Sequence, residues 1–164
     1  MLSNVEVSPT DFFLTMTIVR ATLKHLNDLV LLFDGYRRFY KQESNLEKAH
    51  TFLTNRIKNN QSVIYIAYLD HKAVGFTQLY PLFSSVSMQP MYLLNDLFVD
   101  SNCRNKGVGQ QLIQAAKNLC IEKHYKGLAI QTAFDNPAQH LYERIGFKKD
   151  PDLHLFWTNE SIKV

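Results

Sequence analysis

The sequence predicts an α/β protein in which helices flank one mixed sheet. Apolar residues recur at helical spacing in four segments, whereas the segments between them are rich in β-branched and aromatic residues, as strands are. The two kinds of segment follow the order β-α-α-β-β-β-α-β-α-β-β, with no internal repeat and no low-complexity linker. A single sheet with helices packed on it follows from this order.

The first half of the chain is expected to form a strand, two helices and a hairpin. Each helical pattern begins behind a capping residue, and the two strand-like runs of the hairpin meet at an Asp-His turn. The expected elements are a strand over residues 16–21, a helix from Thr22 to about Tyr40, a helix from Asn45 to Asn59, and strands over residues 62–69 and 72–80.

The second half is expected to contain the central strand. Residues 81–90, PLFSSVSMQP, are bounded by prolines and rich in serine, which indicates a loop. Residues 91–99, MYLLNDLFV, are too apolar for a solvated face, which indicates a central strand. The remaining expected elements are a helix over residues 107–124, a strand over 128–134, a short helix from Asn136 to Gly146, and a closing strand pair in FKKD (147–150) and LHLFW (153–157).

The composition restricts the classes of function. Lys and Arg outnumber Asp and Glu by 18 to 15 without a long basic run, so we expect no nucleic-acid partner and only a weak preference for an anionic ligand. The two cysteines and six scattered histidines predict neither a disulfide framework nor a metal site. The scarcity of cysteines predicts a reducing cytoplasmic location, and no apolar run is long enough for a membrane span. The length of 164 residues predicts a single domain, over residues 16–164, preceded by an N-terminal extension over residues 1–15.

Residues 103–109, CRNKGVG, place two glycines directly before a helical pattern. Unpaired N–H groups at a helix start point at one spot, so an anion can bind there, and Arg104 and Lys106 add positive charge. Glycine at positions 107 and 109 allows a phosphate to approach the backbone closely. The spacing excludes a P-loop and a dinucleotide fingerprint, which leaves another kind of phosphate loop and a plain helix start as the alternatives.

The segment VDSNCRNKGVGQQLIQAA, preceded by YLLNDLF and followed by NPAQHLYERIGF, resembles the GNAT superfamily of N-acetyltransferases, which use acetyl-coenzyme A (acetyl-CoA). The resemblance covers residues 16–158 in element order, and its specific part runs from Tyr92 to Phe147. It implies that two neighbouring central strands splay apart and that the pantetheine arm of the cofactor fills the gap. It also implies that main-chain amides of the glycine loop bind the pyrophosphate.

The resemblance extends to individual residues. Tyr142 matches a tyrosine that protonates the leaving thiolate, although a plain core aromatic is the alternative. Family members often carry an Asn seven residues before this tyrosine, where this chain has Asp135, so either Asp135 or Asn136 would contact the cofactor, or Asn136 only caps a helix. The residues implied at the cofactor are Leu97, Phe98 and Val99 in the central strand and Arg104, Asn105, Lys106, Gly107, Val108, Gly109 and Gln110 in the loop.

The group that takes the proton from the acceptor amine is left open. An alkylammonium ion has no free lone pair, so attack on a thioester needs a proton acceptor. Many relatives use the first acid of an E-D pair in the central strand, but here Asn95 stands first and Asp96 second, and strand alternation points them to opposite faces unless a bulge intervenes. Asp96 is either this base or a structural carboxylate; the other routes for the proton are water, Tyr80, His50 and Glu43.

The acceptor site is expected beside the central strand and at the end of the first helix. Aromatic rings there can hold a cationic amine, or they can be ordinary core and dimer contacts. The segments YRRFY, GFTQLYP and LNDLFVD look most like those of small superfamily members that act on polyamines, amino acids or basic protein tails. The residues expected to bind the acceptor are Tyr36, Tyr40, Gln78, Tyr80 and Asn95.

The expected function is direct transfer of the acetyl group of acetyl-CoA to a primary amine of a small molecule or basic peptide, with no metal and no membrane partner. The rival functions are a catalytically silent acyl-CoA sensor, which the substitution at Asn95 suggests, and an anion-binding regulator that is not an enzyme. The resemblance also implies a homodimer formed through the C-terminal strands, with Phe156 and Trp157 as candidate contacts. Cys103 is expected to be a bystander and Cys120 a core residue.

Overall fold

A computed structural model describes residues 15–152 and 154–161 of the chain. They fall into two compact units, one ending at Gln131 and the other beginning at Thr132. The expected N-terminal extension, residues 1–15, lies outside the described residues except for Thr15.

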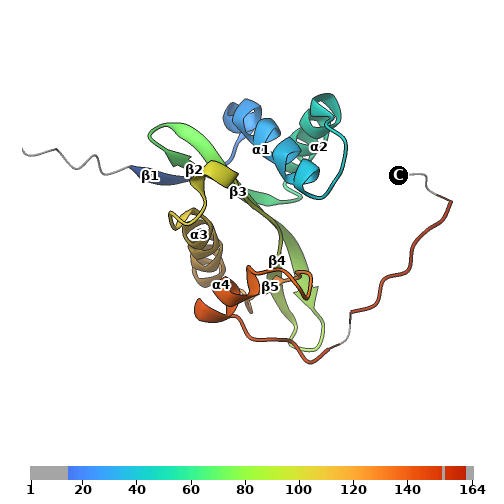
Figure 1. The fold of residues 1–164 in the computed structure, drawn as a ribbon. Coiled ribbons are helices and arrows are strands. Elements are labelled where there is room, and N and C mark those ends of the chain that lie inside the picture. The colour runs from blue at the N-terminus through green and yellow to red at the C-terminus, as the bar shows by residue number, and fades with distance from the viewer. Residues whose placement is uncertain (1–14, 153, 162–164) are drawn as a thin grey trace, which may run out of the picture. The chain divides into compact units, whose positions relative to one another are not determined.

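The first unit is built on a five-stranded mixed sheet with the strand order β1-β2-β3-β4-β5 (Figure 1). Neighbouring strands are antiparallel from β1 to β4, and β5 is parallel to β4. The predicted α/β class with one mixed sheet is therefore confirmed. The strands are β1 (Met16–Arg20), β2 (Val63–Leu69), β3 (Lys72–Ser84), β4 (Gln89–Val99) and β5 (Leu128–Ile130).

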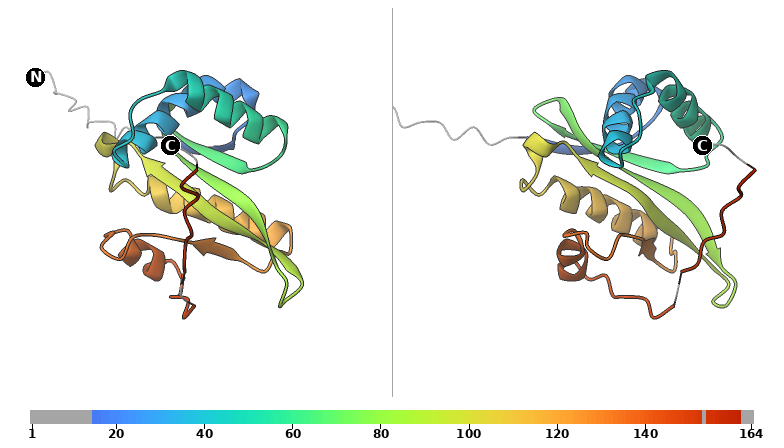
Figure 2. Two further views of the ribbon diagram at one scale, coloured as in Figure 1. Left: turned by 90° about the vertical axis from the view of Figure 1, so that its right-hand side faces the viewer. Right: turned by 45° about the vertical axis from the view of Figure 1, so that its right-hand side comes forward.

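Helices cover both faces of this sheet. Figures 1 and 2 show α1 (Leu26–Phe39) and α2 (Leu46–Lys58) on one face and α3 (Val108–Glu122) on the other. The short 3-10 helix η1 (Leu23–His25) precedes α1, and η2 (Ser101–Cys103) follows β4. In the second unit the described residues contain one helix, α4 (Gln139–Arg144).

Each face of the sheet has its own apolar core, as the helical spacing in the sequence predicts. The core under α1 and α2 includes the fully buried Leu29, Leu53 and Phe76. The core under α3 includes Val74 and Leu112, and Leu97 and Val99 of β4 pack against it. Phe98, between those two residues, packs against the other core, so β4 contributes to both.

Polar side chains cap η1, which leads into α1, and α2. Thr22 accepts a hydrogen bond from the Lys24 N–H at 3.3 Å and caps η1, which leads directly into α1. Asn45 accepts one from the Lys48 N–H at 2.9 Å and caps α2, so both residues are caps as predicted. The buried carboxylate of Asp34 in α1 accepts hydrogen bonds from the Ser44 hydroxyl at 2.8 Å and the Asn45 N–H at 2.9 Å. These contacts attach the connection between the two helices to α1.

The prediction of a loop over residues 81–90 was wrong. Most of these residues belong to β3 and β4, and the turn is confined to residues 85–88. The prolines at both ends suggested a loop because they lack the N–H that a strand ladder needs. However, β2 stops pairing with β3 at Leu79, so Pro81 needs no donor on that side. The pairing of β4 with β5 begins at Tyr92, so Pro90 likewise needs no N–H donor on the side of β5.

Two further expectations near the C-terminus were wrong. The strand expected over residues 128–134 ends at Ile130, which pairs with Leu94 directly before β4 bends. The expected closing strands, FKKD and LHLFW, are absent among the described residues of the second unit, where Phe156 and Trp157 are more than 80% exposed. Alternating apolar residues suggested strands, but a strand also needs a neighbour to pair its backbone, and none of the described residues 132–152 and 154–161 forms one.

Candidate active site

Asn95 forms a β-bulge in the middle of β4. Gln78 pairs with Asp96, and the next residue of β3, Leu79, pairs with Leu94, so Asn95 has no partner on β3. The bulge brings the two polar side chains together: the Asn95 amide donates to Asp96 Oδ1 at 2.9 Å. In a regular strand these two side chains would point to opposite faces of the sheet. The bulge that Asp96 needs in order to act as the base is therefore present.

Beyond the bulge, β4 presents an open edge. Strand β5 pairs with β4 only from Tyr92 to Leu94, and no other strand among the described residues of the first unit pairs with this edge up to Val99. The Asp100 N–H donates to the Val74 carbonyl at 2.8 Å, so Asp100 faces β3. Because residues of an antiparallel strand alternate between their two neighbours, Leu97 and Val99 direct their N–H and C=O groups to the open edge. The expected splay is thus present, and an extended chain can add to β4 there.

The glycine loop ends at the start of α3. Gly107 has a left-handed φ of 79° and is the N-terminal cap of α3, without a capping side chain. The first hydrogen bond of the helix runs from the Gln111 N–H to the Gly107 carbonyl at 3.0 Å. The N–H groups of Val108, Gly109 and Gln110 therefore precede the helical ladder and point out of the helix start. Such a group of donors, with no acidic residue in the first turn, suits an anion.

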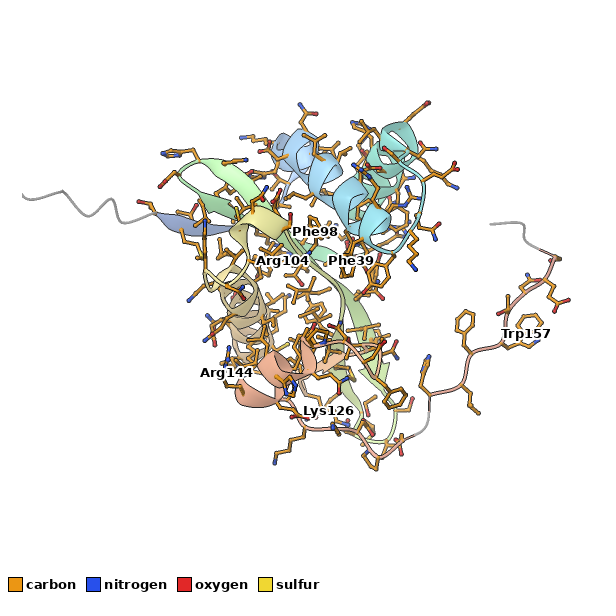
Figure 3. All side chains as sticks on the ribbon, in the orientation of Figure 1. Phe39, Phe98, Arg104, Lys126, Arg144 and Trp157 are labelled. Atoms are coloured by element: carbon orange, nitrogen blue, oxygen red, sulfur yellow. The ribbon has the colours of Figure 1, made fainter. Side chains whose placement is uncertain are left out.

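Arg104 connects this loop with β4 and α1. Its Nε donates to the Val99 carbonyl at 3.2 Å, and its guanidinium carbon lies 5.6 Å from the centre of the Phe39 ring (Figure 3). The next residue, Asn105, has a positive φ of 60°. The Arg104 side chain therefore holds the loop against the open edge, which leaves anion binding mainly to main-chain groups.

Replacing Gly107 with Ala is expected to weaken anion binding at the start of α3 about fivefold to tenfold. A Cβ at this position would meet no atom within 4 Å, so the cost comes from the left-handed backbone, about 1–1.4 kcal/mol for a residue with a side chain. Gly127→Ala is the matched control, because its Cβ would also enter open space and its φ is not in the left-handed region. Calorimetric titration with inorganic pyrophosphate tests this expectation, and equal dissociation constants for the two variants would contradict it.

Asp96 is the centre of a buried polar cluster. It is 3% exposed, and its Oδ2 accepts a hydrogen bond from the Gln78 amide at 2.6 Å. Its main-chain carbonyl accepts one from the Thr77 hydroxyl at 2.8 Å. Burial raises the pKa of the Asp96 carboxyl above its ordinary value, although hydrogen bonds from Gln78, Tyr36 and Asn95 act in the opposite direction. A carboxylate with a raised pKa is a better proton acceptor than an exposed one.

Two tyrosines face this carboxylate. Burial, reinforced by the charge of Asp96, raises the pKa of Tyr36, which also donates a hydrogen bond to Asp96. Burial and the same charge raise the pKa of Tyr80 to about 12, against the opposing effect of Arg56. Both phenols are therefore protonated at neutral pH, so Tyr80 is unsuited to the role of base.

The structure brings the expected acceptor residues together around Asp96. Gln78, Asn95 and Tyr36 contact its carboxylate, Tyr80 interacts with it electrostatically, and the Tyr40 ring lies 5.0 Å from that of Tyr36. His50 and Glu43, two other routes suggested for the proton, are exposed on α2 and on the connection before it. Sequence reasoning missed Ser62 and Thr77, because only the strand pairing shows that they reach the cluster.

The remaining predicted residues lie in the second unit. Tyr142 in α4 is 7% exposed, and its ring packs edge-on against that of Phe147 with centres 6.0 Å apart. The Asn136 side-chain oxygen Oδ1 accepts from the Ala138 N–H at 3.0 Å, and its side-chain amide Nδ2 donates to the Thr132 hydroxyl at 2.7 Å, so Asn136 caps the turn before α4. Asp135 is exposed. Contact of these residues with the cofactor stays a prediction.

The part of the chain that the structure describes contains neither a metal-binding cluster nor a membrane-spanning helix. Its His, Cys, Asp and Glu side chains do not gather in any group of three or more that is suited to a metal ion. Its helices include none with the length and apolar character needed to cross a membrane.

An open central edge next to a glycine-capped helix defines an acyltransferase-like site, and the comparisons with known proteins identify its family. The profile described as "Acetyltransferase (GNAT) domain" matches residues 60–149. The chain therefore belongs to the GNAT acetyltransferases, and it is an acetyltransferase.

Relatives and solved structures agree with this family. An uncharacterized N-acetyltransferase of Bacillus subtilis, YhfO, is 45% identical over 90% of this chain and 100% of its own length. The crystal structure of a probable acetyltransferase superposes with a TM-score of 0.83 at 39% identity, over 90% of this chain and 99% of that one. An aminoglycoside N-acetyltransferase in complex with CoA shares the fold, with a TM-score of 0.75 at 21% identity over 90% of this chain and 96% of the other.

Proposed function

We propose that the protein transfers the acetyl group of acetyl-CoA directly to a primary amine. The observation that carries this proposal is the open edge of β4, which lies between the exposed donors at the start of α3 and the polar cluster around Asp96. The aminoglycoside acetyltransferase of the same fold that was solved with CoA supports the choice of cosubstrate.

Each part of the site has a role in this proposal. The main-chain amides from Arg104 to Gln110 bind the pyrophosphate, with help from the charge of Lys106, and the backbone of Leu97 to Val99 pairs with the pantetheine arm. A main-chain N–H of β4 stabilises negative charge on the acetyl oxygen. Asp96 receives the proton of the amine, directly or through water, and Tyr142 protonates the thiolate. Asp135 or Asn136 contacts the cofactor.

The acceptor is proposed to be a polyamine, an amino acid or a basic protein tail. A buried carboxylate next to Tyr36, Tyr40 and Tyr80 suits a cationic amine, because aromatic faces and the carboxylate both attract the ammonium form before it loses its proton. We also propose a cytoplasmic location and a homodimer, with the exposed Phe156 and Trp157 as candidate contacts.

Thiol release from acetyl-CoA tests the proposal. The protein is incubated with acetyl-CoA and, in turn, a polyamine, amino acids, an aminoglycoside and a basic peptide, while titration calorimetry measures acetyl-CoA binding. We expect binding together with thiol release for at least one class of amine. Binding without release across the panel would favour an acyl-CoA sensor, and the absence of binding would overturn the proposal.

A further inference from the structure

A chain of hydrogen bonds leads from Ser62 to the carboxylate of Asp96. The Ser62 hydroxyl donates to Gln78 Oε1 at 2.8 Å, and Gln78 Nε2 donates to Asp96 Oδ2 at 2.6 Å. Gln78 has no solvent exposure, and Ser62 is half-buried directly before β2. The Gln78 side chain is therefore enclosed by protein and engaged at both ends, so it contacts Asp96 rather than the acceptor.

The two ends of the Gln78 amide are not equivalent for Asp96. An ionised carboxylate only accepts hydrogen bonds, so it is stabilised when Nε2 faces it and destabilised when Oε1 faces it. Donation from Ser62 satisfies Oε1 on the other side and, through the polarised amide, strengthens the donation from Nε2. Without that hydroxyl, Gln78 Oε1 would be buried with no hydrogen bond from Ser62. The preference of the amide for the orientation in which Nε2 faces Asp96 would then be weaker.

We propose that Ser62 is a positioning residue for the acetyl transfer, because its hydroxyl fixes the Gln78 amide so that Nε2 keeps the Asp96 carboxylate ionised and able to take a proton. The proposal rests on the proposed function, in which Asp96 is the base. Thr77 has a complementary effect, since its hydroxyl binds the main-chain carbonyl of Asp96 at 2.8 Å and thus holds the bulged backbone.

Other groups also face Asp96. Tyr36 from α1 and Asn95 from β4 donate to its carboxylate, and Tyr80 from β3 lies within electrostatic range. Tyr80 in turn is affected by Arg56 of α2 and accepts a hydrogen bond from Gln78. Of the residues that donate to the carboxylate, Asn95 is exposed and Tyr36 half-buried, whereas Gln78 is enclosed and is itself held by a second side chain. Removing Ser62 therefore alters one donor and leaves the others in place.

The test is the protonation of Asp96 in Ser62→Ala. Loss of a donor to the ionised form raises the pKa of the carboxyl, so the acid limb of the pH profile of kcat/KM is expected to move to higher pH by up to about one unit, a tenfold change in proton affinity. Ser62→Thr, which keeps a hydroxyl, is expected to restore the wild-type limb. Ser85→Ala, in the exposed turn between β3 and β4, is the control and is expected to leave the limb unchanged.

A second readout separates this proposal from the proposed function. Titration of the ¹³C-labelled Asp96 carboxyl by NMR reports its pKa whether or not the enzyme turns over, and Gln78→Met, which removes the amide, is expected to shift the titration at least as far as Ser62→Ala. An unmoved Asp96 titration in either folded variant would overturn the positioning role. Lower activity at every pH with an unmoved limb, or a failure of Ser62→Thr to restore it, would also overturn that role. An absence of thiol release in the wild type would instead overturn the proposed function.

Discussion

Tyr142→Phe is expected to lower kcat by about a hundredfold or more while leaving the affinity for acetyl-CoA nearly unchanged. General acid catalysis contributes about 10²–10⁴-fold, and the thiolate needs a proton as it leaves. The substitution keeps the ring that packs against Phe147 in the buried environment of α4 and removes only the hydroxyl, so the fold should be preserved. The measurement is kcat from thiol release with the best amine of the panel, together with calorimetry of acetyl-CoA binding.

A matched control distinguishes the loss of the acid from a general effect of removing a phenol. Tyr125, whose ring stacks on Tyr92 with centres 5.1 Å apart, has no proposed role in transfer, so Tyr125→Phe should keep the wild-type rate. If Tyr142→Phe is as fast as Tyr125→Phe, Tyr142 has no part in the chemistry and is a core aromatic. If its kcat falls together with a loss of melting temperature, the hydroxyl is structural.

Local patterns in the sequence were sufficient to predict most of the fold. The caps Thr22 and Asn45 and the apolar spacing behind them located α1 and α2, because a helix start and one buried face are both decided within a few residues. The apolar run of β4 likewise indicated its central place in the sheet. The two prolines led to a wrong prediction. A strand accepts proline where no second neighbouring strand needs its N–H group, and this depends on how the sheet is assembled.

The geometry of the candidate site depends on the register of the strands. Local patterns in the sequence do not reveal this register. No Gly or Pro marks the bulge at Asn95, and only the pairing of Gln78 with Asp96 reveals it. The same register brings Gln78 to the carboxylate, where sequence reasoning had assigned it to the acceptor. Ser62 was read only as the first residue of a strand, and its contact with Gln78 depends on a side chain sixteen positions away in the sequence.

The substitution at Asn95, which suggested a silent sensor, has another physical interpretation. The first position of the usual acidic pair is exposed here and donates to the second, Asp96, which is buried among three donors. An amide at the first position stabilises the carboxylate, whereas a second carboxylate there would repel it. In place of two acids, this chain has one acid and an amide that donates a hydrogen bond to it. This arrangement is compatible with Asp96 as the base.

Asp96→Asn is expected to lower kcat/KM at neutral pH by about 10²–10⁴-fold and to abolish the acid limb of the pH profile that belongs to this carboxyl. Asn is nearly the same size but has no basic oxygen with a titrating proton, so the proton of the amine must reach water unaided. Asp152→Asn, on the exposed chain of the second unit, is the control for the loss of one negative charge and should be fully active. The measurement is the pH dependence of thiol release for both variants.

Thermal stability separates this catalytic effect from unfolding, and its sign follows from the raised pKa of Asp96. A group whose pKa is higher in the folded state contributes its full stability below its ordinary pKa, 3.8 for this residue, and that contribution is lost as the pH rises through the folded value. At pH 7 the wild type therefore bears the cost of a buried charge, and Asp96→Asn does not. The variant also turns an NH2 group toward one of the three donors, so we expect it to melt close to the wild-type temperature at pH 7 while remaining almost inactive. A fully active variant would make Asp96 a structural carboxylate.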